Sequence, residues 1–114
     1  MPASHLIPVT DADCAAQVLE AERPVVVDVW AAWCPPCRVM TPILDGLAAE
    51  RPDVAFVSLD ADVNRETVVA HHVLSMPTFL VFRDGREVLR LVGSRPRHRL
   101  LAELEAVLGA PALA

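Results

Sequence analysis

The stretch VVVDVWAAWCPPC, residues 25–37, decides the fold class of this chain. Residues 25–30 are β-branched or aromatic apart from Asp28 and are apolar on both parities, which predicts a strand buried on both faces. Pro36 suits an early position of a helix, which we expect to continue to about Glu50 with a kink at Pro42. An inner strand leading directly into a helix is typical of an α/β fold.

The remaining segments predict a mixed sheet with helices on both faces. We expect an extended segment over residues 5–9 and strands over residues 54–59, 78–82 and 87–92. A first helix should run from Thr10 or Asp11 to about Ala21, with an apolar stripe made of Cys14, Ala15, Val18 and Leu19. A short helix is expected over residues 65–71, and a last helix is expected to be capped by Ser94. Asp84-Gly85 between two apolar runs predicts a β-hairpin. The element order is βαβαβαββα, a central mixed five-stranded sheet flanked by four helices.

Length and composition set limits on the class of protein. The 114 residues predict one domain over positions 1–114, without a linker or an internal repeat. A net charge of −5 argues against a nucleic-acid partner, and the cluster around Arg95, Arg97 and Arg99 is interpreted as a solvated face of the last helix. We find no signal peptide and no membrane segment, so we expect a cytoplasmic protein that does not bind membranes.

Cys34 and Cys37 are separated by two residues and can close a small disulfide ring without moving the backbone. Cys34 precedes a helix, whose unpaired amides favour a thiolate, so we expect it to be the nucleophile and Cys37 the resolving thiol. The alternatives are a pair of buried structural thiols, or half of a zinc site. Zinc needs about four ligands, and only Cys14, His71 and His72 could supply the rest. Cys14 itself fits a buried structural thiol.

Asp28 is an acid inside an apolar strand, six residues before Cys34. Burial disfavours the charged carboxylate and raises its pKa, so we interpret Asp28 as the group that takes the proton from Cys37. The alternative is an edge-strand aspartate that faces solvent. Met76-Pro77 opens a strand, and composition does not decide whether that bond is cis.

The run from Val25 to Pro42, together with Met76-Pro77-Thr78, Asp84-Gly85 and Gly93, resembles the thioredoxin family along essentially the whole chain. The resemblance implies the thioredoxin fold, reduction of disulfides in client proteins, and a redox-active disulfide between Cys34 and Cys37. It implies no bound cofactor and no metal, with electrons from NADPH through a flavoprotein thioredoxin reductase. We expect a monomer.

The resemblance also implies that Pro77 is cis and stands beside the Cys34 sulfur. An extended client segment would dock on an apolar face made of Trp33, Pro35, Pro36, Val73, Met76, Pro77 and Gly93. Three positions depart from the family pattern: Pro35 where glycine is usual, Ser58 where a lysine often neighbours the acid, and Arg38 after the second cysteine. Pro35 removes an amide donor and should leave the Cys34 thiolate less stabilised.

Two other functions share these features. A disulfide oxidant or isomerase uses the same thiol chemistry in the opposite direction, with the residues between the cysteines tuning the equilibrium. A non-enzymatic interaction module would use the apolar face rather than the thiols, but the presence of both cysteines and Asp28 argues against it.

Overall fold

The computed structural model describes residues 5–110. In chain order it contains β1 (Ile7–Pro8), the short π-helix η1 (Ala15–Leu19), β2 (Val25–Trp30), α1 (Pro35–Glu50), β3 (Ala55–Asp60), α2 (Arg65–Ala70), β4 (Thr78–Arg83), β5 (Arg86–Val92) and α3 (Arg97–Leu108). The strands form one sheet in the order β1-β3-β2-β4-β5. β1, β3 and β2 run parallel, whereas β4 is antiparallel to β2 and to β5. This confirms the predicted mixed α/β fold.

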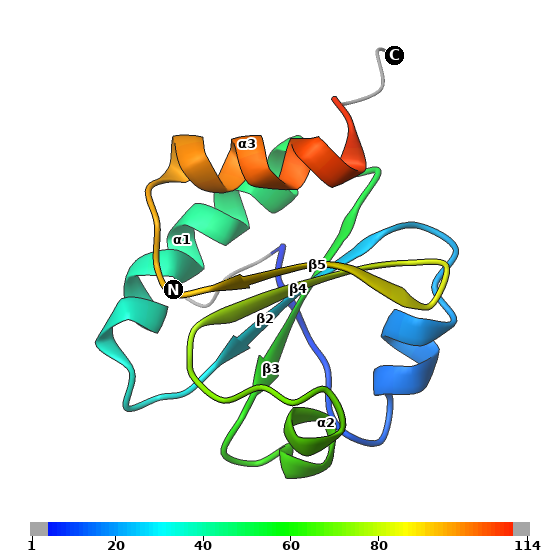
Figure 1. Cartoon of the computed structure of the whole chain (residues 1–114), viewed down its shortest axis with the longest axis vertical. Helices are drawn as coiled ribbons and strands as arrows, with labels where there is room; N and C mark the ends of the chain where they lie inside the picture. Colours follow the sequence, from blue (N-terminus) through cyan, green and yellow to red (C-terminus); the bar gives the residue numbers. More distant parts are fainter. Residues whose placement is uncertain (1–4, 111–114) are drawn as a thin grey trace.

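Helices cover both faces of the sheet. Figure 1 shows α1 and α3 together on one side, with α2 and η1 on the other. Alternate residues of β2 serve the two sides: Val26 packs with the leucines of α1 and α3, whereas Val25 and Val27 pack with Cys14 and Val18 beneath η1. The absence of alternation in residues 25–30 is therefore explained by a strand covered on both faces.

β2 lies in the middle of the sheet, between β3 and β4. It ends at Trp30, and the chain turns at residues 31–34 before α1 begins at Pro35. Pro42 lies inside α1, as predicted. This connection places Cys34 immediately before the first turn of α1, at the end of β2.

Two helix starts differ from prediction. The expected helix from Thr10 to Ala21 is reduced to the short η1, with Ala15 and Leu19 exposed, and Asp11 caps a different helix. Its carboxylate accepts the amides of Glu66 and Thr67 at 3.2 and 2.9 Å and so caps α2 from a distant segment. The hydroxyl of Thr67 donates to the same carboxylate and, as the largest cause, lowers its pKa.

The last helix begins after Pro96, which makes no side-chain cap, so the prediction of a Ser94 cap was wrong. Pro96 has an extended backbone and fixes the entry into α3 instead. Arg97 and Arg99 are exposed on the helix surface as predicted, and they pair with Glu50 and Glu103. The prediction was wrong for Arg95, which precedes the helix: its side chain is only 6% exposed because it lies against Glu103 and bonds to it.

The hairpin between β4 and β5 turns at Asp84 and Gly85, whose φ angles are +53° and +77°. Both lie in the left-handed region that a two-residue turn of this kind requires. The register then shifts: Val81 pairs with Leu89 and Phe82 with Glu87, leaving Val88 as an extra residue on β5. β5 therefore contains a bulge at Val88, close to the hairpin turn.

Within the described part of the chain, every helix is too short or too polar to span a bilayer.

Candidate functional site

Cys34 and Cys37 form a disulfide, with Cα atoms 5.3 Å apart. Cys34 is the N-cap residue of α1, and its sulfur accepts the Cys37 amide at 3.3 Å. Pro35 and Pro36 have no N–H, so Cys37 supplies the first amide of the helix. A helix amide aimed at this sulfur stabilises negative charge on it once the disulfide is opened.

The disulfide is almost covered by its surroundings. Cys34 is 3% exposed and Cys37 1%, and both pack against Ala31, Trp30 and Met76. The Cys34 sulfur lies 3.5 Å from the carbonyl oxygen of Met76, a distance at which a protonated thiol can donate a hydrogen bond. Met76 therefore lies beside the disulfide through both its side chain and its carbonyl oxygen.

The Met76–Pro77 peptide bond is cis, as the family resemblance implied. The Pro77 carbonyl accepts the amide of Gly93 at 2.8 Å. These contacts bring together residues from three distant parts of the sequence at one end of the strands: Cys34, Met76 with Pro77, and Gly93.

Asp28 is 1% exposed in the middle of β2, which excludes a solvent-facing edge position. It lies two residues after Val26 and opposite Phe79, and both of these pack on the α1–α3 side of the sheet. Its carboxylate therefore points to the side that carries α1 and Cys37. Among the described residues, its Oδ1 atom has no hydrogen-bond partner.

Burial raises the pKa of Asp28 from its ordinary value of 3.8 to about 7. Desolvation is the only cause, since no neighbouring charge contributes. Ser58 is the residue paired with Asp28 on β3, at the position where the family often has a lysine. A carboxyl with a pKa near neutrality is suited to accept and return a proton at physiological pH.

The other titratable candidates lie away from the disulfide. Cys14 packs beneath η1, where burial raises the pKa of its thiol, and His71 contacts the ring of Phe82 edge-on. No group of three or more His, Cys, Asp or Glu side chains within residues 5–110 is arranged to hold a metal ion.

A protein-family model described as Thioredoxin matches residues 5–106. The chain belongs to the thioredoxin family. Thioredoxin of Mycobacterium bovis is 45% identical over 105 residues, which cover 91% of this chain and 90% of that protein. Thioredoxin of Mycolicibacterium smegmatis is 41% identical over 108 residues, or 92% and 96% of the two chains.

A third relative, from Mycobacterium leprae, is named bifunctional thioredoxin reductase/thioredoxin. It is 41% identical over 102 residues, which cover 89% of this chain and 22% of that protein. With the disulfide at the start of α1, membership of the thioredoxin family makes this chain a thiol–disulfide oxidoreductase that works by reversible oxidation of Cys34 and Cys37.

The seven residues expected to form the docking face differ in their exposure. Trp33 is 62% exposed and its indole N–H donates to Asp62 at 3.2 Å, while Pro35 and Pro36 are exposed beside it. Met76 and Gly93 are half-buried, whereas Val73 and Pro77 are buried. Val73 packs in the core beneath η1 and α2, so its side chain contributes to the core and not to the exposed surface.

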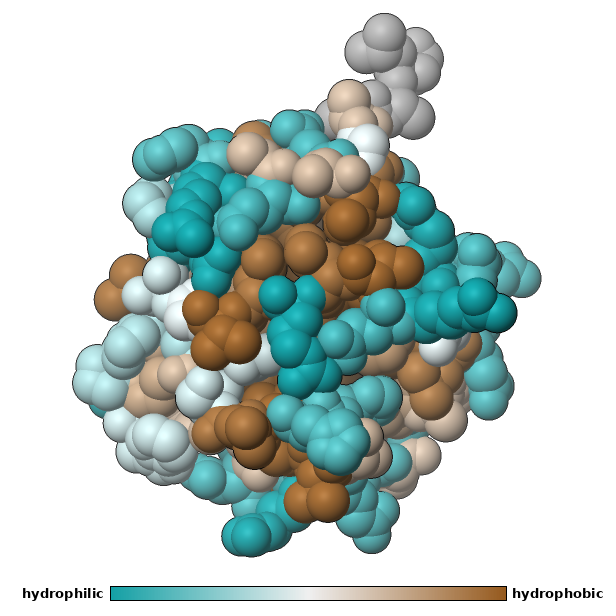
Figure 2. Space-filling view, viewed as in Figure 1, coloured by the Kyte–Doolittle hydropathy of each residue, from teal (hydrophilic) through white to brown (hydrophobic). Residues whose placement is uncertain are grey.

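Two apolar residues beside this face were missed by the sequence reasoning. Leu74 is 94% exposed in the loop before Met76, and Val92 is exposed next to Gly93. Figure 2 shows apolar side chains reaching a largely hydrophilic surface near the end of β5 and the loop leading into β4. The exposure of Leu74 depends on the path of the loop between α2 and β4, so the sequence carried no signal that identified it.

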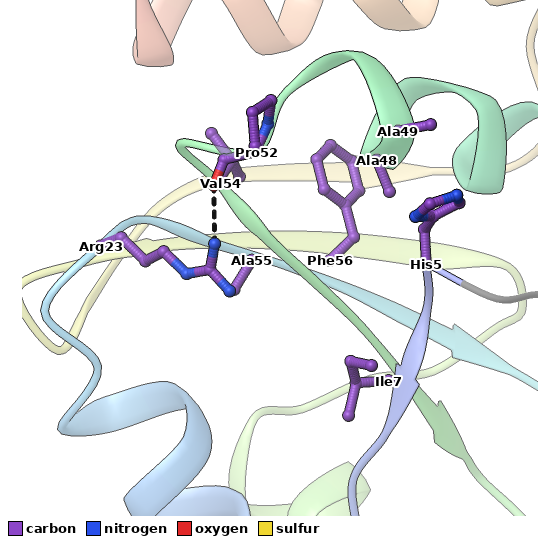
Figure 3. Close-up of a pocket in the computed structure, with 9 residues that line it drawn as sticks. All are labelled: His5, Ile7, Arg23, Ala48, Ala49, Pro52, Val54, Ala55 and Phe56. Carbon is purple, nitrogen blue, oxygen red and sulfur yellow. Dashed lines mark hydrogen bonds between the residues drawn. The ribbon is translucent and has the colours of Figure 1, made fainter.

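An open pocket of about 370 Å³ lies elsewhere, near the C-terminal end of α1. Figure 3 shows His5 and Phe56 at this pocket, with Arg23 donating to the Pro52 carbonyl at 2.7 Å. Ala48 and Cys34 are at opposite ends of α1, roughly 20 Å apart at 1.5 Å per residue. The disulfide is therefore separate from this pocket.

Proposed function

We propose that this protein reduces disulfides in client proteins, with Cys34 attacking and Cys37 resolving. The Cys34 thiolate attacks one client sulfur, forming a mixed disulfide and releasing the other client sulfur as a thiolate. Cys37 then loses its proton and attacks the Cys34 sulfur, which restores the Cys34–Cys37 disulfide and releases the second client thiolate. The observation that carries the proposal is the Cys34 sulfur at the tip of α1, accepting the Cys37 amide.

Asp28 is proposed to take the proton from Cys37 in the resolving step. Its pKa of about 7 leaves it partly ionised at neutral pH, and its carboxylate is on the α1 side of the sheet. A thiol attacks only as thiolate, so a base that becomes available near pH 7 accelerates this step.

Clients are proposed to dock on the face formed by Trp33, Pro35, Pro36, Met76, Pro77 and Gly93, with Val73 supporting it from beneath. Exposed Trp33 and half-buried Met76 flank the covered disulfide, which supports docking of an extended segment between them. Leu74 and Val92 extend this face with further apolar area.

Electrons are proposed to come from NADPH through a flavoprotein thioredoxin reductase in the cytoplasm. The M. leprae relative, whose name joins a thioredoxin reductase to a thioredoxin, supports such a partner. The proposed working unit is a monomer, because a second copy on the docking face would exclude the client.

The test is reduction of insulin disulfides, coupled to NADPH oxidation by candidate thioredoxin reductases. We expect turnover with the wild-type protein and none with Cys34→Ser, while Cys14→Ser serves as the matched control and retains turnover. Redox titration against glutathione tests the direction. A reductase has a low reduction potential, whereas a potential in the range of disulfide oxidants would contradict the proposal.

A further inference from the structure

The loop from His71 to Met76 brings the client-facing backbone to the redox site. It begins where α2 ends, carries the fully exposed Leu74, and ends with the Met76 carbonyl 3.5 Å from the Cys34 sulfur. A shift of the exposed part of this loop would move the apolar side chain of Leu74 and so change the surface that a client meets.

Arg90 of β5 holds the start of this loop. Its guanidinium donates to the carbonyl of His71 at 2.5 Å and to that of His72 at 3.1 Å. These carbonyls lie at the C-terminal end of α2, where a helix leaves acceptors without partners of its own. One side chain thus ties the last turn of α2 to a strand on the other side of β4.

Arg90 binds the chain at His72, where the chain changes direction after α2. His72 has φ +54°, in the left-handed region that non-glycine residues rarely adopt. Such a conformation persists only where the surroundings hold it. The amides of His72 and Val73 hold this turn through the carbonyls of Val69 and Val68 at 3.1 and 3.0 Å, as at many helix ends. The Arg90 bond to the His72 carbonyl is a further restraint, and it is the one that fixes the turn, and with it the path of residues 73–76, relative to β5.

Glu87 in turn holds Arg90. Its two carboxylate oxygens accept from Nε and Nη2 of Arg90 at 2.9 and 2.8 Å, and this bond lowers the pKa of Glu87. Residues three apart on a regular strand point to opposite faces. The extra residue Val88 of the bulge brings Glu87 and Arg90 to the same face, so the irregular strand serves this contact.

Arg90 points to the α2 side of the sheet because its neighbours Leu89 and Leu91 both pack on the α1–α3 side. We propose that Arg90, oriented by Glu87 across the bulge in β5, is a positioning residue for client binding that fixes the 71–76 loop beside Cys34. This inference rests on the proposed docking of clients at that loop. Arg90 touches neither sulfur, so it sets how well a client binds and leaves the thiol chemistry unchanged.

The test compares Arg90→Met, which keeps the length of the side chain and loses its donors, with Arg86→Met as the matched control. Arg86 is exposed on the same strand, and its side chain, unlike its backbone in the ladder with β4, makes no hydrogen bond or ion pair among residues 5–110. We expect the KM for insulin to rise roughly three- to tenfold in Arg90→Met, since ordering a free loop is then required on binding, with kcat nearly unchanged. Arg86→Met should keep the wild-type KM.

Two further readouts separate positioning from a general loss of structure. Reaction with a small aromatic disulfide, which has no extended segment, should proceed at the wild-type rate in Arg90→Met. Amide hydrogen exchange at Leu74 and Met76 should be faster, while exchange in β2 is unchanged. Arg90→Lys should restore only part of the affinity, because an ammonium lacks the planar fork that reaches both carbonyls and Glu87.

The results distinguish this inference from the proposed function. Wild-type KM and loop exchange in Arg90→Met, with active wild-type protein, would overturn the positioning role alone. Equal losses with insulin and with the small disulfide would also overturn it, because a role limited to docking spares the small substrate. Absence of insulin reduction by the wild-type protein would instead contradict the proposed function. If Arg90→Met does not fold, Glu87→Gln decides: it keeps the arginine, weakens its anchor and should raise KM by a smaller factor.

Discussion

Replacing Asp28 by asparagine should stabilise the protein by an amount that depends on pH. In the folded state the carboxyl has a pKa of about 7, against an ordinary value of 3.8 when the chain is unfolded. Between these values the folded protein holds the proton more firmly than the unfolded chain does. Stability contributed by the protonated carboxyl is therefore complete below about pH 4, declines as pH rises and is lost above about pH 7.

The size of this effect follows from the two pKa values. They differ by about three, and each pKa unit corresponds to about 1.4 kcal/mol, so ionised Asp28 lowers the free energy of unfolding by about 4 kcal/mol above pH 7. The Asp28→Asn variant has a similar shape and no titrating group. Its stability relative to wild type should be constant below pH 4 and rise by about 4 kcal/mol between pH 4 and pH 8.

Urea unfolding of the oxidised proteins at pH 4, 5, 6, 7 and 8 measures this difference directly. Burying the amide adds an offset that is the same at every pH, so it does not affect how the stability difference changes with pH. Asp53→Asn provides a control without this slope: the guanidinium of Arg51 lowers the pKa of Asp53 below its ordinary value of 3.8, so the stability that this carboxylate contributes is nearly complete at pH 4, and the variant should differ from wild type by an almost constant amount between pH 5 and pH 8. A stability difference for Asp28→Asn that does not change with pH would refute a carboxyl perturbed by burial.

Three further changes give separate tests. Cys37→Ser should leave Cys34 attached to the client, so a mixed disulfide accumulates in non-reducing mass spectrometry; free turnover would contradict the assigned order of the thiols. Pro35→Gly restores a first-turn amide and should raise the thiolate population of Cys34 about two- to fivefold near neutral pH, measured by thiolate absorbance; an equal or smaller population would show that Pro35 has no such effect. Gly85→Ala places a methyl 2.9 Å from the Leu19 carbonyl at φ +77° and should cost at least about 1–2 kcal/mol in urea unfolding, whereas an unchanged midpoint would contradict that crowding.

Features that are local in the sequence could be predicted. β2, the start of α1 with its two cysteines, and the Asp84-Gly85 hairpin each depend on residues close together in the chain, and the structure places them as expected. The core position of Asp28 followed from the apolar residues on both sides of it. Its desolvation, with no charged neighbour at Ser58, followed from a single departure from the family pattern.

Features that depend on contacts between distant segments could not be predicted from the sequence. The sequence around Asp11 has the pattern of a local helix cap, and only the fold shows that the carboxylate instead caps α2 more than fifty residues away. Similarly, Leu74 is apolar and was not distinguished from core residues, because its exposure depends on where the loop runs after His72. Helix and strand propensities carry no information about such contacts.

The same distinction separates the chemistry of the site from its selectivity. The nucleophile is the N-cap residue of α1 and its activating amide comes from Cys37 in the first turn, so the start of this one helix supports the reactivity of Cys34. The loop over residues 71–76, where we propose that clients dock, is instead held by Arg90, and the bulge in β5 brings Glu87 within reach of that arginine. Because these supports are independent, substitutions on β5 can change which clients bind without changing how fast the bound disulfide reacts.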